Sequence, residues 1–185
     1  MVESSSCVSE IRCWMALAYS ALGRLSNVWR STVISTTLKF RLLNALVIPI
    51  FLYGNEAWTL TAASCALIDA FHRRCLRRVL GVRWFHFLNN DRLYALAGHP
   101  TKLTTIIRRG RVRLLGHIMR TEQDTPARRV LTAASHSRAP QGWRRPRGHP
   151  RLTWVSQVSS VVPLNDAAHF EQDRRAFREF VATVT

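Results

Sequence analysis

Acidic residues and lysine are scarce in this sequence. Its 185 residues include 11 Asp and Glu against 27 Lys and Arg, which gives a formal net charge of +16. Every basic residue is an arginine except Lys39 and Lys102. Because a guanidinium binds phosphate oxygens two at a time, stacks on bases and keeps its proton, this composition favours nucleic acid as the partner. A drift toward arginine codons is the alternative that composition alone leaves open.

Paired carboxylates are also missing. Two-metal nucleotide polymerisation needs converging carboxylates, commonly adjacent aspartates, and the sequence contains no Asp-Asp pair. The nearest acidic pairs, Glu122 with Asp124 and Glu171 with Asp173, fall in expected loops or helix ends. A phosphate-cradling Gly-x-x-x-x-Gly-Lys loop and a Gly-x-Ser-x-Gly elbow are absent as well. We therefore expect no enzyme activity from these residues alone and assign neither a catalytic residue nor a cofactor.

Cysteine motifs and long apolar runs are lacking too. The 4 cysteines form no Cys-x-x-Cys pair and no zinc-like spacing with histidine, so reduced thiols and no metal site are expected. The longest apolar run, residues 42–53, is interrupted by Asn44 and Pro49 and is too short to cross a bilayer. The residues around Glu3 lack the basic start and apolar stretch of a signal peptide. We expect a nuclear or cytoplasmic protein that is neither secreted nor bound to a membrane.

Apolar residues recur at helical spacing along most of the chain. The spacing predicts helices over residues 8–25, 36–53, 61–80, 89–98 and 103–120, and a last helix beyond Asn165 or Asp166 with Phe170, Phe177 and Val181 as its apolar stripe. Pro49 is expected to kink the second helix or to end it early. The first helix is expected to contribute these residues to a core: Ile11, Met15, Leu17, Ala18 and Leu22. For the helix over residues 103–120 the predicted stripe is Leu103, Ile107, Gly110, Leu114 and Ile118.

Arginines gather on the polar sides of two of these helices. Four arginines within six residues of one helix repel one another unless an anion compensates them, so the pattern indicates nucleic-acid contact, with a solvated face as the alternative. On the helix over residues 61–80 the arginines are Arg73, Arg74, Arg77 and Arg78. On the helix over residues 103–120 they are Arg108, Arg109, Arg111, Arg113 and Arg120. Gly110 and Gly116 interrupt the latter helix and favour the close approach of a helix or of a phosphodiester chain.

Residues 139–151 combine arginine with proline and glycine and contain no acid. Such a segment cannot form a helix or an ordinary strand, so an extended basic arm is expected, with a disordered linker as the alternative. Trp143 offers a surface on which a base can stack. The arm's arginines are Arg144, Arg145, Arg147 and Arg151. The sequence thus predicts a mainly α fold: a helical bundle over residues 8–131, the basic extended arm over 132–152 and a C-terminal helical tail over 153–182.

Five segments occur in an order that is typical of one protein family. They are Tyr53–Leu60, Arg74–Trp84, Arg111–Arg120, Arg147–Trp154 and Asp173–Arg178. In this succession the chain, from about Glu10 to Arg178, resembles the region after the palm in the endonuclease–reverse transcriptases of animal non-LTR (LINE-type) retrotransposons. Three residues depart from the family's usual pattern: Gly110, His149 and Phe177.

The resemblance implies a helical thumb-like domain followed by a C-terminal extension. It implies contact with template–primer nucleic acid, whether RNA, DNA or hybrid duplex, and the palm domain as a second partner. Neither polymerisation nor endonuclease cleavage is implied for these residues. The alternative is a helical protein–protein interaction module that exposes apolar surface, and exposed side chains at Trp58, Trp84 and Phe85 would be evidence for it.

Overall fold

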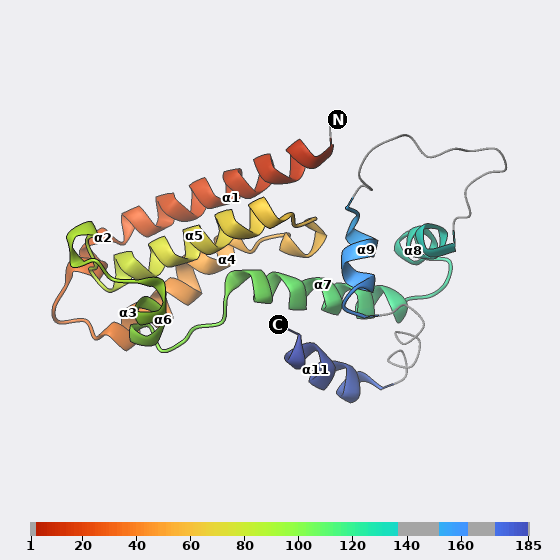
Figure 1. Ribbon diagram of the computed structural model, residues 1–185. Coiled ribbons are helices and arrows are strands. Elements are labelled where there is room, and N and C mark those ends of the chain that lie inside the picture. Colours follow the sequence, from red (N-terminus) through yellow and green to blue (C-terminus); the bar gives the residue numbers. More distant parts are fainter. Residues whose placement is uncertain (1–2, 137–151, 163–172, 185) are drawn as a thin grey trace. The chain divides into compact units, whose positions relative to one another are not determined.

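All regular structure in the described part of the chain is helical. The computed structural model describes residues 3–136, 152–162 and 173–184, and no strand occurs among them (Figure 1). The prediction of a mainly α fold is confirmed to that extent. The contacts divide the chain into two compact units, unit 1 with residues 1–55 and 60–106 and unit 2 with residues 56–59 and 107–185. The ranges predicted for the bundle, the arm and the tail stay predictions.

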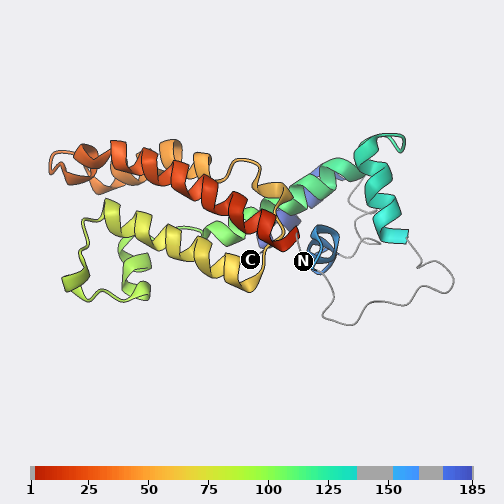
Figure 2. The same cartoon turned by 90° about the horizontal axis from the view of Figure 1, so that it is seen from above.

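Unit 1 is organised around its first helix. α1 contacts α4 and α5, and it lies alongside both in the two views (Figures 1 and 2). The α-helices of unit 1 are α1 (Glu3–Arg24), α2 (Ser26–Arg30), α3 (Thr36–Leu42), α4 (Ile48–Phe51), α5 (Ala62–Val79) and α6 (Asn90–Leu96). Shorter elements are the π-helix η1 (Leu43–Val47) and the 3-10 helices η2 (Asn55–Ala57) and η3 (Trp84–His86), of which η2 extends into unit 2.

The buried side of α1 is narrower than the sequence predicted. Ile11, Met15, Ala18 and Leu22 are all buried, as expected from their spacing of three and four residues. Leu17 is 48% exposed, so its assignment to the core was wrong. By the helical period it lies well outside the arc that the other four residues share, and the elements that the structure describes leave it exposed.

The second predicted helix changes type just before Pro49 and does not stop there. Residues 36–51 form three consecutive pieces, α3, the π-helical η1 and α4, with Pro49 in the first turn of α4. A proline lacks the N–H for the ordinary helical bond and its ring crowds the preceding turn, and a π-turn is a known way to absorb such a disruption. Although this run is apolar, it is not buried throughout: Leu38 and Leu46 are 45% and 46% exposed.

Local capping signals set the ends of α5 and α6. Thr61 and Ser64 form a reciprocal capping box at the start of α5, and Asn89 accepts a hydrogen bond from the Arg92 amide at the start of α6. After α5, Gly81 adopts a φ of 67°, and the Val82 amide donates to the Arg77 carbonyl at 2.9 Å. This is the Schellman arrangement, in which a left-handed glycine satisfies the last carbonyls of a helix.

Unit 2 is built on the longer part of α7 (Leu103–Met119), from Ile107 onward. Its other helices are α8 (Pro126–His136), α9 (Trp154–Ser159) and α11 (Arg174–Thr183). Eight buried side chains form its core: Val112, Leu115, Leu131, Val158, Val162, Phe177, Val181 and Val184. The Trp154 indole ties the short segment 56–59 to α9 by donating to the Glu56 carbonyl at 2.6 Å.

The buried side of α7 differs from the stripe predicted for it. Leu103 and Ile107 are buried as expected, but further along the helix Val112 and Leu115 are buried, whereas the predicted Leu114 is only half-buried. The first turn of α7 belongs to unit 1 and the rest to unit 2, so its neighbours change along its length. A single straight stripe cannot describe such a helix.

Gly116 of α7 lies directly against the Phe177 ring of α11. A β-carbon placed on Gly116 would overlap the edge of the Phe177 ring, on atoms Cε1 and Cζ. The sequence had left open a neighbouring helix or a phosphodiester chain at this glycine. Within unit 2 the neighbour is the aromatic ring of α11.

We predict that Gly116→Ala destabilises unit 2 because the added methyl must displace the buried Phe177 ring. Overpacking of this kind costs about 1–3 kcal/mol, more than the helix-propensity gain of alanine. Gly23→Ala is the matched control: Gly23 also lies in a helix, nothing surrounds its β-position, and the substitution should stabilise by about 0.5–1 kcal/mol. Urea unfolding followed by circular dichroism measures both. An equal gain of stability in the two variants would contradict the packing described here.

Candidate nucleic-acid interface

The arginines of α5 lie on the side opposite its apolar face. Arg74 and Arg78 are exposed, and Arg73 and Arg77 are half-buried. We call these four residues the α5 basic face. The opposite face is buried in unit 1 and consists of Ile68, Phe71, Cys75, Leu76 and Val79. The separation follows from the helical period, which places the four arginines and the five apolar residues on separate arcs of the helix.

Two members of the α5 basic face also contact other parts of unit 1. The Arg74 guanidinium lies over the Tyr19 ring, 5.6 Å from its centroid, in a cation–π geometry. Arg77 donates through Nη2 to the Leu88 carbonyl at 3.3 Å and to Asn90 Oδ1 at 3.0 Å. Arg77 therefore holds the segment between α5 and α6, whereas Arg78 projects from the helix at an exposed position.

A buried histidine lies next to this face. His72 is 3% exposed and packs edge-on against Tyr94, with ring centroids 6.0 Å apart. The pKa of His72 is lowered to about 4, mainly by burial; the charge of Asp69 opposes the shift and the nearby Arg73 adds to it. The ring is therefore neutral at physiological pH, so it adds no positive charge to the α5 basic face.

The arginines predicted on α7 differ in their exposure. Arg108 and Arg113 are exposed, Arg109 and Arg120 are half-buried, and Arg111 is 5% exposed. Sequence spacing placed all five beside the apolar stripe. The structure instead brings Arg111 into the interior of unit 2.

The engaged arginines of unit 2 donate to backbone carbonyls. Arg111 donates through Nη1 to the Trp58 carbonyl at 3.4 Å and to the side chain of Gln157 on α9. Arg109 donates to the carbonyls of Val184 and Ala182 at 2.9 and 2.8 Å, at the C-terminal end of α11. A cation there also interacts favourably with the helix dipole. Arg109 and Arg111 thus fasten neighbouring segments to α7.

Arg113 and Arg120 face two further arginines that the sequence reasoning did not select. Together with Phe177 and Val181 they line a pocket with Arg174 and Arg178 of α11, with a volume of about 430 Å³. We call this the α7–α11 pocket. The spacing of Arg174 and Arg178, four residues apart on either side of Phe177, was the available signal. Because all four guanidiniums are positive, the pocket concentrates charge of one sign.

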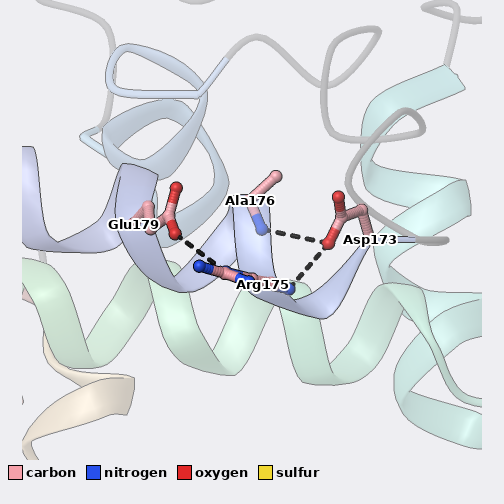
Figure 3. Close-up of polar contacts among 4 residues, drawn as sticks. All are labelled: Asp173, Arg175, Ala176 and Glu179. Carbon is pink, nitrogen blue, oxygen red and sulfur yellow. Dashed lines mark hydrogen bonds and ion pairs between the residues drawn. The ribbon is translucent and has the colours of Figure 1, made fainter.

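The carboxylates of Asp173 and Glu179 on α11 interact with partners outside the α7–α11 pocket. Figure 3 shows Asp173 Oδ1 accepting hydrogen bonds from the Arg175 and Ala176 amides, at 2.8 and 3.0 Å, and Glu179 paired with Arg175 at 3.3 Å. Between side chains that the structure describes, this is the one ion pair that joins an arginine to a carboxylate. Both partners are largely exposed, at 91% and 70%, so the pair contributes little to stability.

The remaining predicted site residues lie outside the described residues. They are Trp143, Arg144, Arg145, Arg147 and Arg151. Within the ranges that the structure describes, no cluster of three His, Cys, Asp or Glu side chains is arranged to hold a metal ion. None of the helices described is both long enough and apolar enough to span a bilayer.

Comparisons with protein-family models, with curated proteins and with solved structures find no match for this chain.

We predict that His72 makes the stability of unit 1 depend on pH. Its pKa is depressed from 6.5 to about 4 in the folded chain, so the unfolded chain binds more protons between these values. The contribution is therefore fully present above pH 6.5 and is lost as the pH falls toward 4, by about 3 kcal/mol in all. Urea unfolding across this range should show a shallower pH dependence for His72→Phe than for the unsubstituted chain.

His117→Gln is the control for this measurement, because His117 is exposed on α7. Its pH dependence should follow that of the unsubstituted chain, in which carboxyl groups also titrate. If the His72→Phe curve coincided with the control curve, burial of a neutral imidazole would not be the cause.

Proposed function

We propose that this chain is a thumb-like nucleic-acid-binding module of a non-LTR retrotransposon reverse transcriptase. In this proposal its exposed arginines contact the backbone of a template–primer duplex, and its apolar helix faces form the two cores. The observation that carries the proposal is the α5 basic face, where exposed guanidiniums stand on one side of a helix whose other side is buried. The order of the five sequence segments that resemble the family supports it.

Charge is the physical basis of the binding that we propose. Arg74 and Arg78 are four residues apart, so they are neighbours on the helix surface and repel each other in the absence of an anion. A row of phosphates compensates both at once and releases condensed counterions, which makes the affinity strongly dependent on salt. Contacts to phosphates carry no sequence information, so the binding should tolerate any sequence.

Burial narrows the set of arginines that a duplex can reach. Arg111 lies inside unit 2, and Arg77 and Arg109 already donate to neighbouring segments of the protein. The exposed members of the predicted set in the described ranges are Arg74, Arg78, Arg108 and Arg113. The proposal therefore assigns backbone contact first to Arg74 and Arg78 of the α5 basic face.

A protein–protein interaction module is the alternative function. It finds mixed support: Trp58 is 2% exposed and Phe85 46% exposed, while the Trp84 side chain lies outside the described part of the structure. The observation in its favour is an apolar groove of about 370 Å³ within unit 2, lined by Ile118, Val130 and Trp154 among others. A partner bound through such a groove would show little dependence on salt, which separates the two functions.

We predict that the chain binds an RNA–DNA hybrid duplex with an affinity that falls steeply between about 0.05 M and 0.5 M salt. The double variant Arg74→Gln and Arg78→Gln should weaken binding and reduce the slope of log affinity against log salt by about 2, because each lost phosphate contact removes about one released counterion. Fluorescence anisotropy of a labelled duplex measures both quantities.

The matched control is the double variant Arg12→Gln and Arg41→Gln. Both arginines are exposed in unit 1, on α1 and α3, so the net charge changes equally while the α5 basic face is intact. The control should retain most of the salt slope. An affinity that does not respond to salt, or an equal loss of slope in the two double variants, would count against the proposed function.

A further inference from the structure

The α7–α11 pocket has the geometry of a site for a compact anion. α7 contributes Arg113 and Arg120, and α11 contributes Arg174 and Arg178, so guanidiniums converge on the space from two helices. The volume of about 430 Å³ accommodates a phosphate group with its attached sugar. The α5 basic face, by contrast, is a helix surface.

The apolar floor of the pocket fixes one of these arginines. Phe177 is 4% exposed and Val181 is 2% exposed, and both are part of the core of unit 2. The Arg120 guanidinium lies over the Phe177 ring, 5.5 Å from its centroid. Its Nη1 atom is shielded from solvent and finds no hydrogen-bond partner among the described residues. A buried, unpartnered guanidinium nitrogen is costly, and a nearby anion would lower that cost.

The charges around the pocket are not balanced by the protein residues described. Burial lowers the pKa of Arg120, and the positive charges of Arg174 and Arg178 lower it further, so the three guanidiniums repel one another. The acidic residues of α11 are engaged otherwise, Asp173 in capping the helix and Glu179 in pairing with Arg175 (Figure 3). Assembling four like charges in this way is unfavourable unless a ligand supplies negative charge.

Among anions, a phosphomonoester fits this arrangement better than the backbone phosphodiester. A monoester at a strand end carries nearly two negative charges and three free oxygens, which suit several planar guanidinium forks at once. A phosphodiester carries one charge, and the strand must leave on both sides of it. A concave site that receives charge from two helices therefore favours a strand end.

We propose that the α7–α11 pocket binds the terminal phosphate of a nucleic-acid strand through Arg113, Arg120, Arg174 and Arg178. The inference deepens the proposed function and rests on it, since it names the group that unit 2 recognises. It leaves duplex backbone binding to the α5 basic face.

The test compares duplexes of one sequence that end in a 5′-phosphate, a 3′-phosphate or hydroxyl groups. We expect at least one phosphorylated duplex to bind about tenfold more tightly than the hydroxyl form. The double variant Arg174→Gln and Arg178→Gln should abolish this preference and leave most of the affinity for the hydroxyl duplex. Arg113→Gln, at an exposed position on α7, should reduce the preference without disturbing the core.

Arg175→Gln is the matched control on α11, because Arg175 is 91% exposed and paired with Glu179 outside the pocket. It should keep the preference. Inorganic phosphate is the second probe. If millimolar phosphate competes with the duplexes and erases the preference, the pocket binds the phosphate group itself. If phosphate binds but the chain shows no preference among the duplexes, the assignment to strand ends is overturned.

The outcomes separate this inference from the proposed function. Equal affinity of the unsubstituted chain for all three duplexes overturns the terminal-phosphate site while leaving the salt-dependent backbone binding in place. A preference that survives in both the Arg174/Arg178 double variant and Arg113→Gln also overturns it. A terminal-phosphate preference that remains while the Arg74 and Arg78 double variant leaves the salt slope unchanged contradicts the proposed function instead.

Discussion

Hydrogen bonds from positively charged side chains to neutral oxygens hold much of this fold together. Arg77 donates to the Leu88 carbonyl, Arg109 to Val184 and Arg111 to Trp58, each fastening a segment that a helix alone would not fix. Lys39 does the same with the Trp29 and Ser31 carbonyls, at 3.0 and 2.7 Å, where the chain leaves α2. A carbonyl satisfies the donor but does not cancel its charge. The fold therefore uses its cations for structure and still keeps its positive charge.

This constraint connects the composition to the proposed binding. With 27 basic and 11 acidic residues, most guanidiniums cannot find a carboxylate within the chain. Among the described arginines, some are bonded to carbonyls, some lie on the α5 basic face and some gather in the α7–α11 pocket, while others, such as Arg12 and Arg41, are exposed elsewhere. The α5 basic face and the α7–α11 pocket create a strong positive local field, which attracts polyanions over distances near the Debye length. Nucleic acid is the ligand class that would neutralise both regions.

Sequence reasoning succeeded where structure is set by near neighbours in the chain. The Thr61 and Asn89 caps and the glycine after α5 depend on a few adjacent residues, and each was predicted. Burial depends on what packs from elsewhere, and there the predictions were weaker. Leu17 is exposed because none of the described elements covers its side of α1, and the stripe of α7 shifts because its partners change. Helix α8 went unpredicted: among its described side chains only Leu131 is buried, so few apolar residues mark its inner side.

The candidate site shows the same division. The side of α5 on which its arginines lie followed from helical periodicity alone. The burial of Arg111 could not be foreseen, because it requires Trp58 and Gln157, which are far away in sequence. Arg174 and Arg178 join Arg113 and Arg120 only through the packing of α11 on α7 at Gly116. A contact between helices some sixty residues apart leaves no trace in local spacing.

The central claim is that nucleic acid is held by the exposed guanidiniums and not by those that fasten the fold. NMR spectra of the arginine Nε–H groups, recorded while an RNA–DNA duplex is added, test it directly. The signals of Arg74 and Arg78 should move with the bound fraction, and those of Arg109 and Arg111 should stay in place. Binding that moved the signals of Arg109 and Arg111 and left those of Arg74 and Arg78 unchanged would contradict the account.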